Sequence, residues 1–69
     1  MKVKNDIIKK IRESASLKRE LLYKMGWSET TLYRYLRENS TDGDLTKASA
    51  LKIISTELEI SESEILTDE

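Results

Sequence analysis

A group of polar side chains with hydrogen-bonding chemistry lies between residues 28 and 38 of this 69-residue chain. At the helical repeat of about 100° per residue, one face of this segment carries apolar side chains and the other carries polar ones. The polar face is formed by Glu29, Thr30, Tyr33, Arg34 and Arg37. Two guanidinium groups beside a phenol, a hydroxyl and a carboxylate offer donors and acceptors to a polar or anionic partner, so this stripe predicts a binding surface.

Each side chain of the stripe has a counterpart on duplex DNA. Arg34 and Arg37 can pair with guanine O6 and N7 or with phosphates, and the sequence leaves both possibilities open. Thr30 can meet a phosphate, a base edge or a thymine methyl group, and Tyr33 can bind a phosphate or pack on that methyl group. Glu29 can accept a hydrogen bond from cytosine N4. The alternative is that the stripe is only the solvated face of an amphipathic helix.

Three further polar residues lie close to this stripe in the sequence. Lys18 and Arg19 stand near the start of the preceding predicted helix, where long basic side chains can reach backbone phosphates. Ser28 directly precedes the stripe and can bind either a phosphate or a base edge. We therefore include all three in the predicted contact surface.

Two short helices joined by a tight turn are predicted to position these residues. The first covers about 17–25, with Ser16 as its N-cap, and the second, the predicted recognition helix, covers about 28–38. Gly26 is expected to end the first helix in the left-handed conformation, and Ser28 to cap the second. A connection this short makes the two helices cross steeply, as in a helix-turn-helix unit.

The remaining segments also show helical periodicity. Apolar residues recur at helical spacing over 3–13 and again over 45–58, which predicts a first and a fourth helix. Ser61 and Glu64 match a capping box, so a short fifth helix is expected from 62 to about 66. The chain is thus predicted to be all-α, a compact five-helix domain.

Charge is unevenly distributed along the chain, although its net charge is only −1. Residues 1–37 contain ten basic and four acidic side chains, whereas residues 38–69 contain two basic and nine acidic ones. The first part therefore carries +6 and the second −7. A basic half that includes the polar stripe favours a polyanionic partner, although a merely solubilising surface is also compatible with it.

Composition excludes several classes of function. The chain contains neither cysteine nor histidine, so the usual zinc ligands, thiolate nucleophile and general base are all missing. We accordingly predict no catalytic residue, metal site, cofactor or small-molecule substrate. Because no apolar run reaches the length of a membrane span or a signal peptide, a cytoplasmic protein without a membrane partner is expected.

Two stretches of the chain form recurring patterns of apolar and turn residues. The first comprises Leu21, Met25, Gly26, Trp27, Ser28, Leu32 and Tyr35. The second comprises Leu51, Ile54, Leu58, Ile60, Ser61, Ile65 and Leu66. In this order they resemble the lambda-repressor-like (Cro/XRE-type) helix-turn-helix family of bacterial and phage regulators. With the predicted first helix, the resemblance covers nearly the whole chain, 1–69, as a single domain. The chain departs from the family pattern at Leu22, where a small residue is usual, at Lys18, where glutamine is frequent, and in the acidic loop 42–44.

The resemblance implies sequence-specific binding of duplex DNA by a small transcriptional regulator. Repression by a two-fold homodimer is what the family implies, with the helix at 28–38 in the major groove. The alternative is a helix-turn-helix fold used as a protein-interaction adaptor that does not bind DNA, which the acidic loop and the near-neutral net charge favour.

Overall fold

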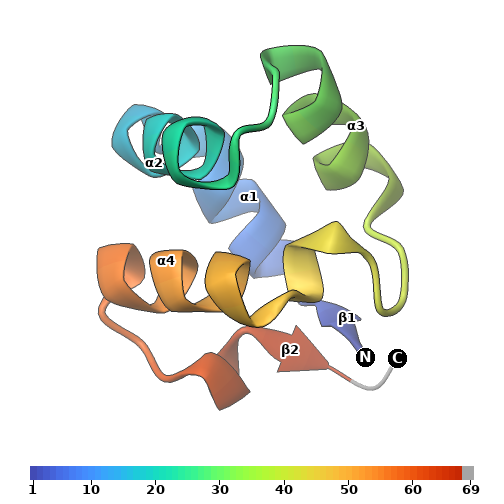
Figure 1. The fold of residues 1–69 in the computed structure, drawn as a ribbon. Coiled ribbons are helices and arrows are strands. Elements are labelled where there is room, and N and C mark those ends of the chain that lie inside the picture. Colours follow the sequence, from blue (N-terminus) through green and yellow to red (C-terminus); the bar gives the residue numbers. More distant parts are fainter. Residues whose placement is uncertain (68–69) are drawn as a thin grey trace.

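The computed structural model describes residues 1–67 as a mostly helical chain that folds around one hydrophobic core (Figure 1). Four α-helices are present among these residues: α1 (Asn5–Glu13), α2 (Ala15–Met25), α3 (Glu29–Glu38) and α4 (Ala48–Leu58). Two single 3-10 turns, η1 (Asp44–Thr46) and η2 (Glu62–Glu64), and two short strands, β1 (Lys2–Val3) and β2 (Leu66–Thr67), complete the described chain.

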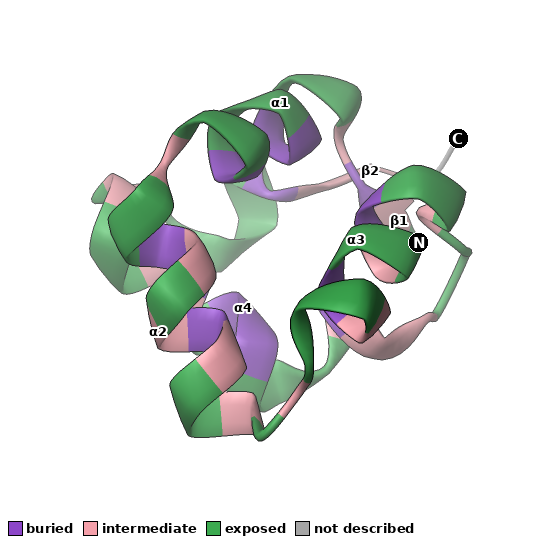
Figure 2. Ribbon diagram, turned by 90° about the horizontal axis from the view of Figure 1, so that it is seen from above, coloured by how far each residue is buried: buried purple, intermediate pink, exposed green. Residues whose placement is uncertain are grey.

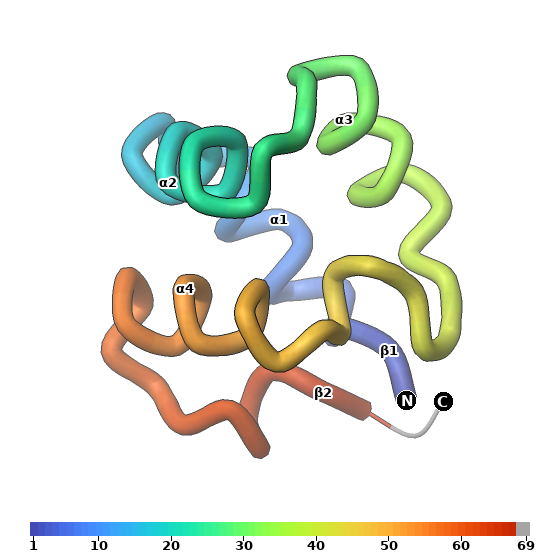
Figure 3. The backbone as a smooth tube through the Cα atoms, in the orientation of Figure 1, coloured from blue at the N-terminus to red at the C-terminus, as the bar shows by residue number. Residues whose placement is uncertain are grey.

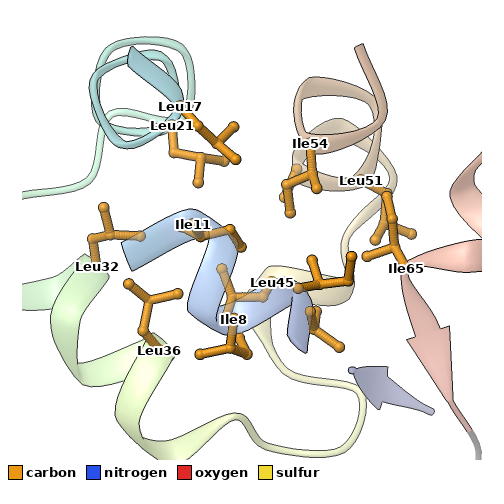
Figure 4. Close-up of a cluster of buried hydrophobic side chains, with 13 residues drawn as sticks. Ile8, Ile11, Leu17, Leu21, Leu32, Leu36, Leu45, Leu51, Ile54 and Ile65 are labelled. Carbon is orange, nitrogen blue, oxygen red and sulfur yellow. The ribbon is translucent and has the colours of Figure 1, made fainter. Parts of the chain in front are cut away.

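The core is formed by one face of every helix, together with residues from β1, η1 and the segment after η2 (Figure 4). Leu17 and Leu21 of α2 lie above α1, Leu32 and Leu36 of α3 lie along one side of it, and α4 closes the other side (Figure 4). Every fully buried side chain among residues 1–67 is apolar. Viewed from above, the buried positions face inward between the helices and the exposed ones face outward (Figure 2). The 3.6-residue periodicity of the sequence is thus the pattern that the core uses.

The prediction of five helices is wrong at the C-terminal end. Residues 62–64 form a single 3-10 turn, η2, and Leu66 already belongs to β2; the Ser61 hydroxyl pairs with that of Ser63 at 3.0 Å and does not cap a helix. The reason is a pairing between the two ends of the described chain. Val3 lies opposite Leu66 in an antiparallel ladder, and the Lys4 amide donates to the carbonyl of Ile65 at 2.8 Å.

Three helix starts also differ from the predictions. Val3 belongs to β1, so α1 begins two residues later, and Leu45 belongs to η1, so α4 begins at Ala48. Helix α2 begins at Ala15 with Ser14 as its N-cap, whose hydroxyl accepts from the amide of Leu17 at 3.2 Å. Val3 and Leu45 thus pack into the core from a strand and a 3-10 turn just outside the helices. Ser14 caps α2 from the residue before it.

The chain path places α3 on one side of the molecule and stacks α2 above α4 on the other (Figure 3). Helix α1 runs between these layers, and β1 and β2 lie together beneath it. The pair α2 and α3 is therefore displayed on one part of the surface, with α4 and the strands beneath as support.

Candidate nucleic-acid interface

The connection between α2 and α3 has the geometry that its sequence predicts. Gly26 adopts φ 71° and ψ 23°, the left-handed conformation. A Cβ atom built on Gly26 would meet nothing within 4 Å, so the backbone conformation and not lack of space requires glycine here. The Ser28 hydroxyl accepts from the Thr31 amide at 3.2 Å and donates to the Thr31 hydroxyl at 2.9 Å. Gly26 and Ser28 therefore end one helix and start the next within three residues.

Helix α3 divides into a buried and an exposed face. Leu32 and Leu36 are buried in the core. The five polar residues of the predicted stripe are all exposed: Glu29, Thr30, Tyr33, Arg34 and Arg37. Tyr33 also carries a large aromatic ring, and the residue as a whole is 44% exposed. An exposed aromatic ring between charged side chains is available for contact with a partner.

A groove of about 270 Å³ separates the first turns of α2 from the first turns of α3. Its lining residues are Ala15, Lys18, Arg19, Leu22, Glu29, Leu32 and Tyr33. Four members of the predicted contact surface, two from each helix, thus lie around one depression. Leu22, where the family pattern has a small residue, is half-buried in the same groove.

Lys18 is positioned across this groove by an aromatic ring. Its ammonium nitrogen lies 5.7 Å from the centroid of the Tyr33 ring, within the range of a cation–π interaction. The contact joins α2 to α3 and leaves the ammonium group close to the exposed phenol. Sequence periodicity placed Lys18 and Tyr33 on separate helices, and only the crossing of the two helices brings them together.

The other members of the predicted set lie away from this groove. Ser28 acts as the cap of α3, and Thr30 and Arg37 project from its exposed face. The guanidinium carbon of Arg34 lies 5.4 Å from the centroid of the Tyr35 ring, on the flank of α3 that faces η1. The predicted contact residues therefore form two neighbouring groups, one around the α2–α3 groove and one along the outer face of α3.

The flank near Arg34 carries an acidic group that the predicted set does not include. The Asp44 carboxylate pairs with the Lys47 ammonium at 2.8 Å. This bond is the main cause that lowers the pKa of Asp44 below its ordinary value, with a hydrogen bond from Tyr35 second and a smaller effect of Arg34. The same bond raises the pKa of Lys47. These two residues stand at i and i+3, a spacing at which opposite charges can pair, and their pairing was not predicted from the sequence.

Tyr35 connects this acidic group to the turn before α3. Its ring packs edge to face against Trp27, with centroids 5.0 Å apart and an angle of 77° between the planes. Tyr35 thus contacts the turn, and its ring also lies 5.4 Å from the guanidinium carbon of Arg34. The orientation of Arg34 is therefore linked to the turn residue and to the loop that follows α3.

Among residues 1–67, no group of three or more histidine, cysteine, aspartate or glutamate side chains is placed to hold a metal ion. Within the same residues, no helix is both long enough and apolar enough to cross a membrane.

Comparison with known proteins gives no assignment: no family model matches the chain, and neither a curated protein nor a solved structure does.

Proposed function

We propose that this protein binds duplex DNA in the major groove through α3, with α2 contacting the adjacent backbone. The observation that carries the proposal is the shared groove of α2 and α3, where Lys18, Arg19 and Tyr33 lie together next to the exposed face of α3. A helix about 10–12 Å in diameter fits the major groove, which is about 12 Å wide. In this orientation the basic side chains of α2 and the side chains of α3 that can contact base edges face the same DNA duplex.

The two groups of residues suggest a division of roles. Lys18 and Arg19 lie on the α2 side of the groove, where a phosphate of the duplex backbone would approach. Thr30, Arg34 and Arg37 project from the outer face of α3 and are assigned to base edges or to phosphates flanking them. Tyr33 holds the Lys18 ammonium and so links the two groups.

The biological role that fits this surface is transcriptional regulation of the lambda-repressor-like type, with repression by occupation of a promoter. The resemblance of the residues around Gly26 and around Ile60 to that helix-turn-helix family supports this role. One α3 helix reads too few base pairs for specificity in a genome, so we propose that two copies bind a two-fold symmetric site.

A salt titration with random-sequence duplex DNA tests the proposal. We expect measurable affinity at low salt and a linear fall of log K with log[salt], with a slope of about −0.9 for each phosphate contacted. Filter binding of labelled DNA measures both quantities. Absence of binding at the lowest salt concentration would refute the proposal.

The double variant Arg34→Ala/Arg37→Ala tests the assigned face. It is expected to weaken binding at least tenfold, because two guanidinium contacts, each worth more than about 1 kcal/mol, are lost. The matched control is Lys9→Ala/Arg12→Ala, which removes two positive charges at the same spacing from the exposed face of α1. Circular dichroism checks that both variants retain their helices. Equal losses in the two variants would show that net charge and not the α3 face determines affinity.

A second candidate function is that of a protein-interaction adaptor. The observation that favours it is the Asp44 carboxylate, whose field reaches Arg34 on the flank of α3 and which would repel a phosphate. An adaptor of this kind would bind a partner protein with the α3 face and show no affinity for DNA at low salt. The salt titration therefore distinguishes the two functions.

A further inference from the structure

The two arginines on the exposed face of α3 have different surroundings. The guanidinium carbon of Arg34 lies 5.4 Å from the centroid of the Tyr35 ring. Arg37 is exposed, and among residues 1–67 it takes part in neither a cation–π contact nor an ion pair. One guanidinium group is therefore held against a ring before any partner arrives, whereas the other can turn toward whichever group approaches it.

The ring that holds Arg34 is itself fixed in place. Tyr35 packs edge to face against Trp27 of the α2–α3 turn, with centroids 5.0 Å apart, and both aromatic residues are half-buried. We call Trp27 and Tyr35 the aromatic support of Arg34. Because this support joins the turn to α3, it restricts the directions in which the guanidinium group presents its N–H donors.

Acidic side chains lie beside the same support. Tyr35, Glu38 and Asp44 line one depression of about 160 Å³. Lys47 offsets part of the charge of Asp44 at 2.8 Å, whereas Glu38 has no ion-pair partner among the described residues. A phosphate bound by Arg34 would be repelled by these carboxylates, while a base edge carries no net charge. This flank of α3 therefore disfavours a phosphate and accepts a base.

The positions of the two arginines along α3 agree with this difference. Counted from Glu29, Arg34 is the sixth of the ten residues of the helix and Arg37 is the ninth. Recognition helices contact base edges mainly with their N-terminal residues, and their C-terminal end can lie against the backbone. Arg37 is thus closer to the end of α3 from which a phosphate is reached.

We propose that Arg34 contacts a guanine and Arg37 contacts a phosphate, with Trp27 and Tyr35 as positioning residues that act through Arg34. Arginine has five N–H donors and no acceptor, and guanine is the base that presents two acceptors, O6 and N7, in the major groove. The assignment rests on the proposed function and deepens it, because it names the base that is read and the side chain that reads it.

Nitrogen-15 relaxation of the arginine Nε–H groups tests the aromatic support without DNA. The order parameter of Arg34 is expected to exceed that of Arg37, because only Arg34 rests on a ring. Tyr35→Leu should lower the Arg34 value to that of Arg37, whereas Tyr35→Phe, which keeps the ring, should preserve it. Circular dichroism checks that both variants are folded.

Replacement of guanines in a bound duplex tests the contact itself. The preferred sequence is first selected from a pool of random duplexes, and each of its guanines is then replaced in turn by 7-deazaguanine, which lacks the N7 acceptor. At least one replacement should weaken binding by the unmodified chain about tenfold. Arg34→Ala should weaken binding by a similar factor and show no further loss on that replacement, as expected for two changes that remove one contact.

Arg37→Ala is the matched control, since it removes the same side chain from the same face. It should weaken binding to all duplexes alike, reduce the slope of log K against log[salt] by about 0.9 and leave the effect of 7-deazaguanine unchanged.

Variants of the support separate positioning from a purely structural role. Tyr35→Leu should reduce the effect of 7-deazaguanine without changing the salt slope, and Tyr35→Phe should restore it. Trp27→Leu and Trp27→Phe repeat the comparison at the second ring of the support. A loss that Leu and Phe share at both positions would refute the positioning role.

Three results would overturn the assignment of the arginines. The first is equal order parameters of Arg34 and Arg37 in the unmodified chain. The second is an Arg34→Ala variant that keeps the full effect of 7-deazaguanine. The third is an unmodified chain that binds random duplexes without preferring any guanine, which leaves the proposed function intact. Absence of DNA binding at the lowest salt concentration overturns the proposed function and the guanine contact together.

Discussion

At the scale of single residues, two tyrosines of α3 each hold a basic side chain in position. Tyr33 holds the ammonium of Lys18, and Tyr35 lies beneath the guanidinium of Arg34. Two of the basic side chains that we assign to a nucleic acid, Lys18 and Arg34, therefore rest on a ring of α3 before any partner arrives. Such preorganisation lowers the entropy that a long side chain loses on binding.

The ion pair of Asp44 and Lys47 predicts how stability depends on pH. The folded-state pKa of Asp44 lies below its ordinary 3.8, so the pair stabilises the fold above that pH. The contribution is lost as pH falls through the folded-state pKa. The folded-state pKa of Lys47 lies above 10.5, so at the alkaline end the contribution is lost as pH rises through that higher pKa.

Urea unfolding of Asp44→Asn over a pH series checks this expectation. The variant should be less stable than the unmodified chain at neutral pH and equally stable well below the folded-state pKa of Asp44. Because the Lys47 side chain is exposed and that of Asp44 is partly accessible to solvent, the difference at neutral pH should also shrink at high salt. A difference that persists unchanged at the acid end would assign the effect of Asp44 to something other than its charge.

At the scale of elements, the residues that end the helices fix how consecutive elements meet. Gly26, Asn39 and Glu59 each adopt a left-handed conformation directly after a helix. Asn39 has a second role, because its side-chain amide donates to the carbonyl of Val3 at 2.7 Å. One residue thus ends α3 and ties it to β1.

Two substitutions at Asn39 separate these roles. Asn39→Gly keeps the left-handed conformation accessible and loses only the hydrogen bond, at a cost of about 1 kcal/mol in the free energy of unfolding. Asn39→Ala loses both and should cost about 1 kcal/mol more, since φ at this position is 41°. Urea unfolding measures both costs. Equal costs for the two variants would mean that the conformation at Asn39 contributes nothing.

The elements that could be predicted from the sequence are those whose signals are local. Gly26 and Ser28 stand next to the helix ends that they define, and the apolar faces of α2 and α3 repeat within a few residues. The ladder of β1 and β2 joins Val3 to Leu66, and no short window contains that information. Val3 and Leu66 fit a helical spacing with their neighbours, so the local pattern favoured helices where a long-range pairing gives strands.

The candidate site likewise combines features that a local sequence pattern predicts with features that depend on long-range packing. Which side chains of α3 face outward follows from its own periodicity. That Lys18 and Tyr33 share a groove, whereas Arg34 turns toward Asp44, depends on how α3 crosses α2 and η1. Helix crossing is set by the packing of the whole core, and one helix considered alone does not reveal it.

At the scale of the whole molecule, stability depends on closing one small core from both ends of the described chain. A domain of this length buries only about 60% of its unfolded surface. Ile65 is fully buried in the core, and its carbonyl accepts from the Lys4 amide next to β1 at the other end of the described chain. The last described turn is therefore part of the fold and not an appendage.

Shortening Ile65 tests this view. Ile65→Ala is expected to lower the free energy of unfolding by about 2–5 kcal/mol, and Ile65→Val by about 0.5–1.5 kcal/mol, because a cavity forms in proportion to the volume removed. Ile60→Ala, at a half-buried neighbour, should cost less than Ile65→Ala. Urea midpoints followed by circular dichroism measure all three. If Ile65→Ala lowers the free energy of unfolding no more than Ile60→Ala does, Ile65 does not contribute to stability as a core residue.

The edge-to-face pair of Trp27 and Tyr35 has a spectroscopic consequence. Trp27 is the only tryptophan of the chain, and it lies half-buried in the turn between α2 and α3. Its emission therefore comes from one place, next to the helix to which we assign recognition. A Tyr35 ring 5.0 Å away is close enough to transfer its excitation to the indole. The protein thus contains an intrinsic fluorophore that reports on unfolding and on occupation of α3 without any added label.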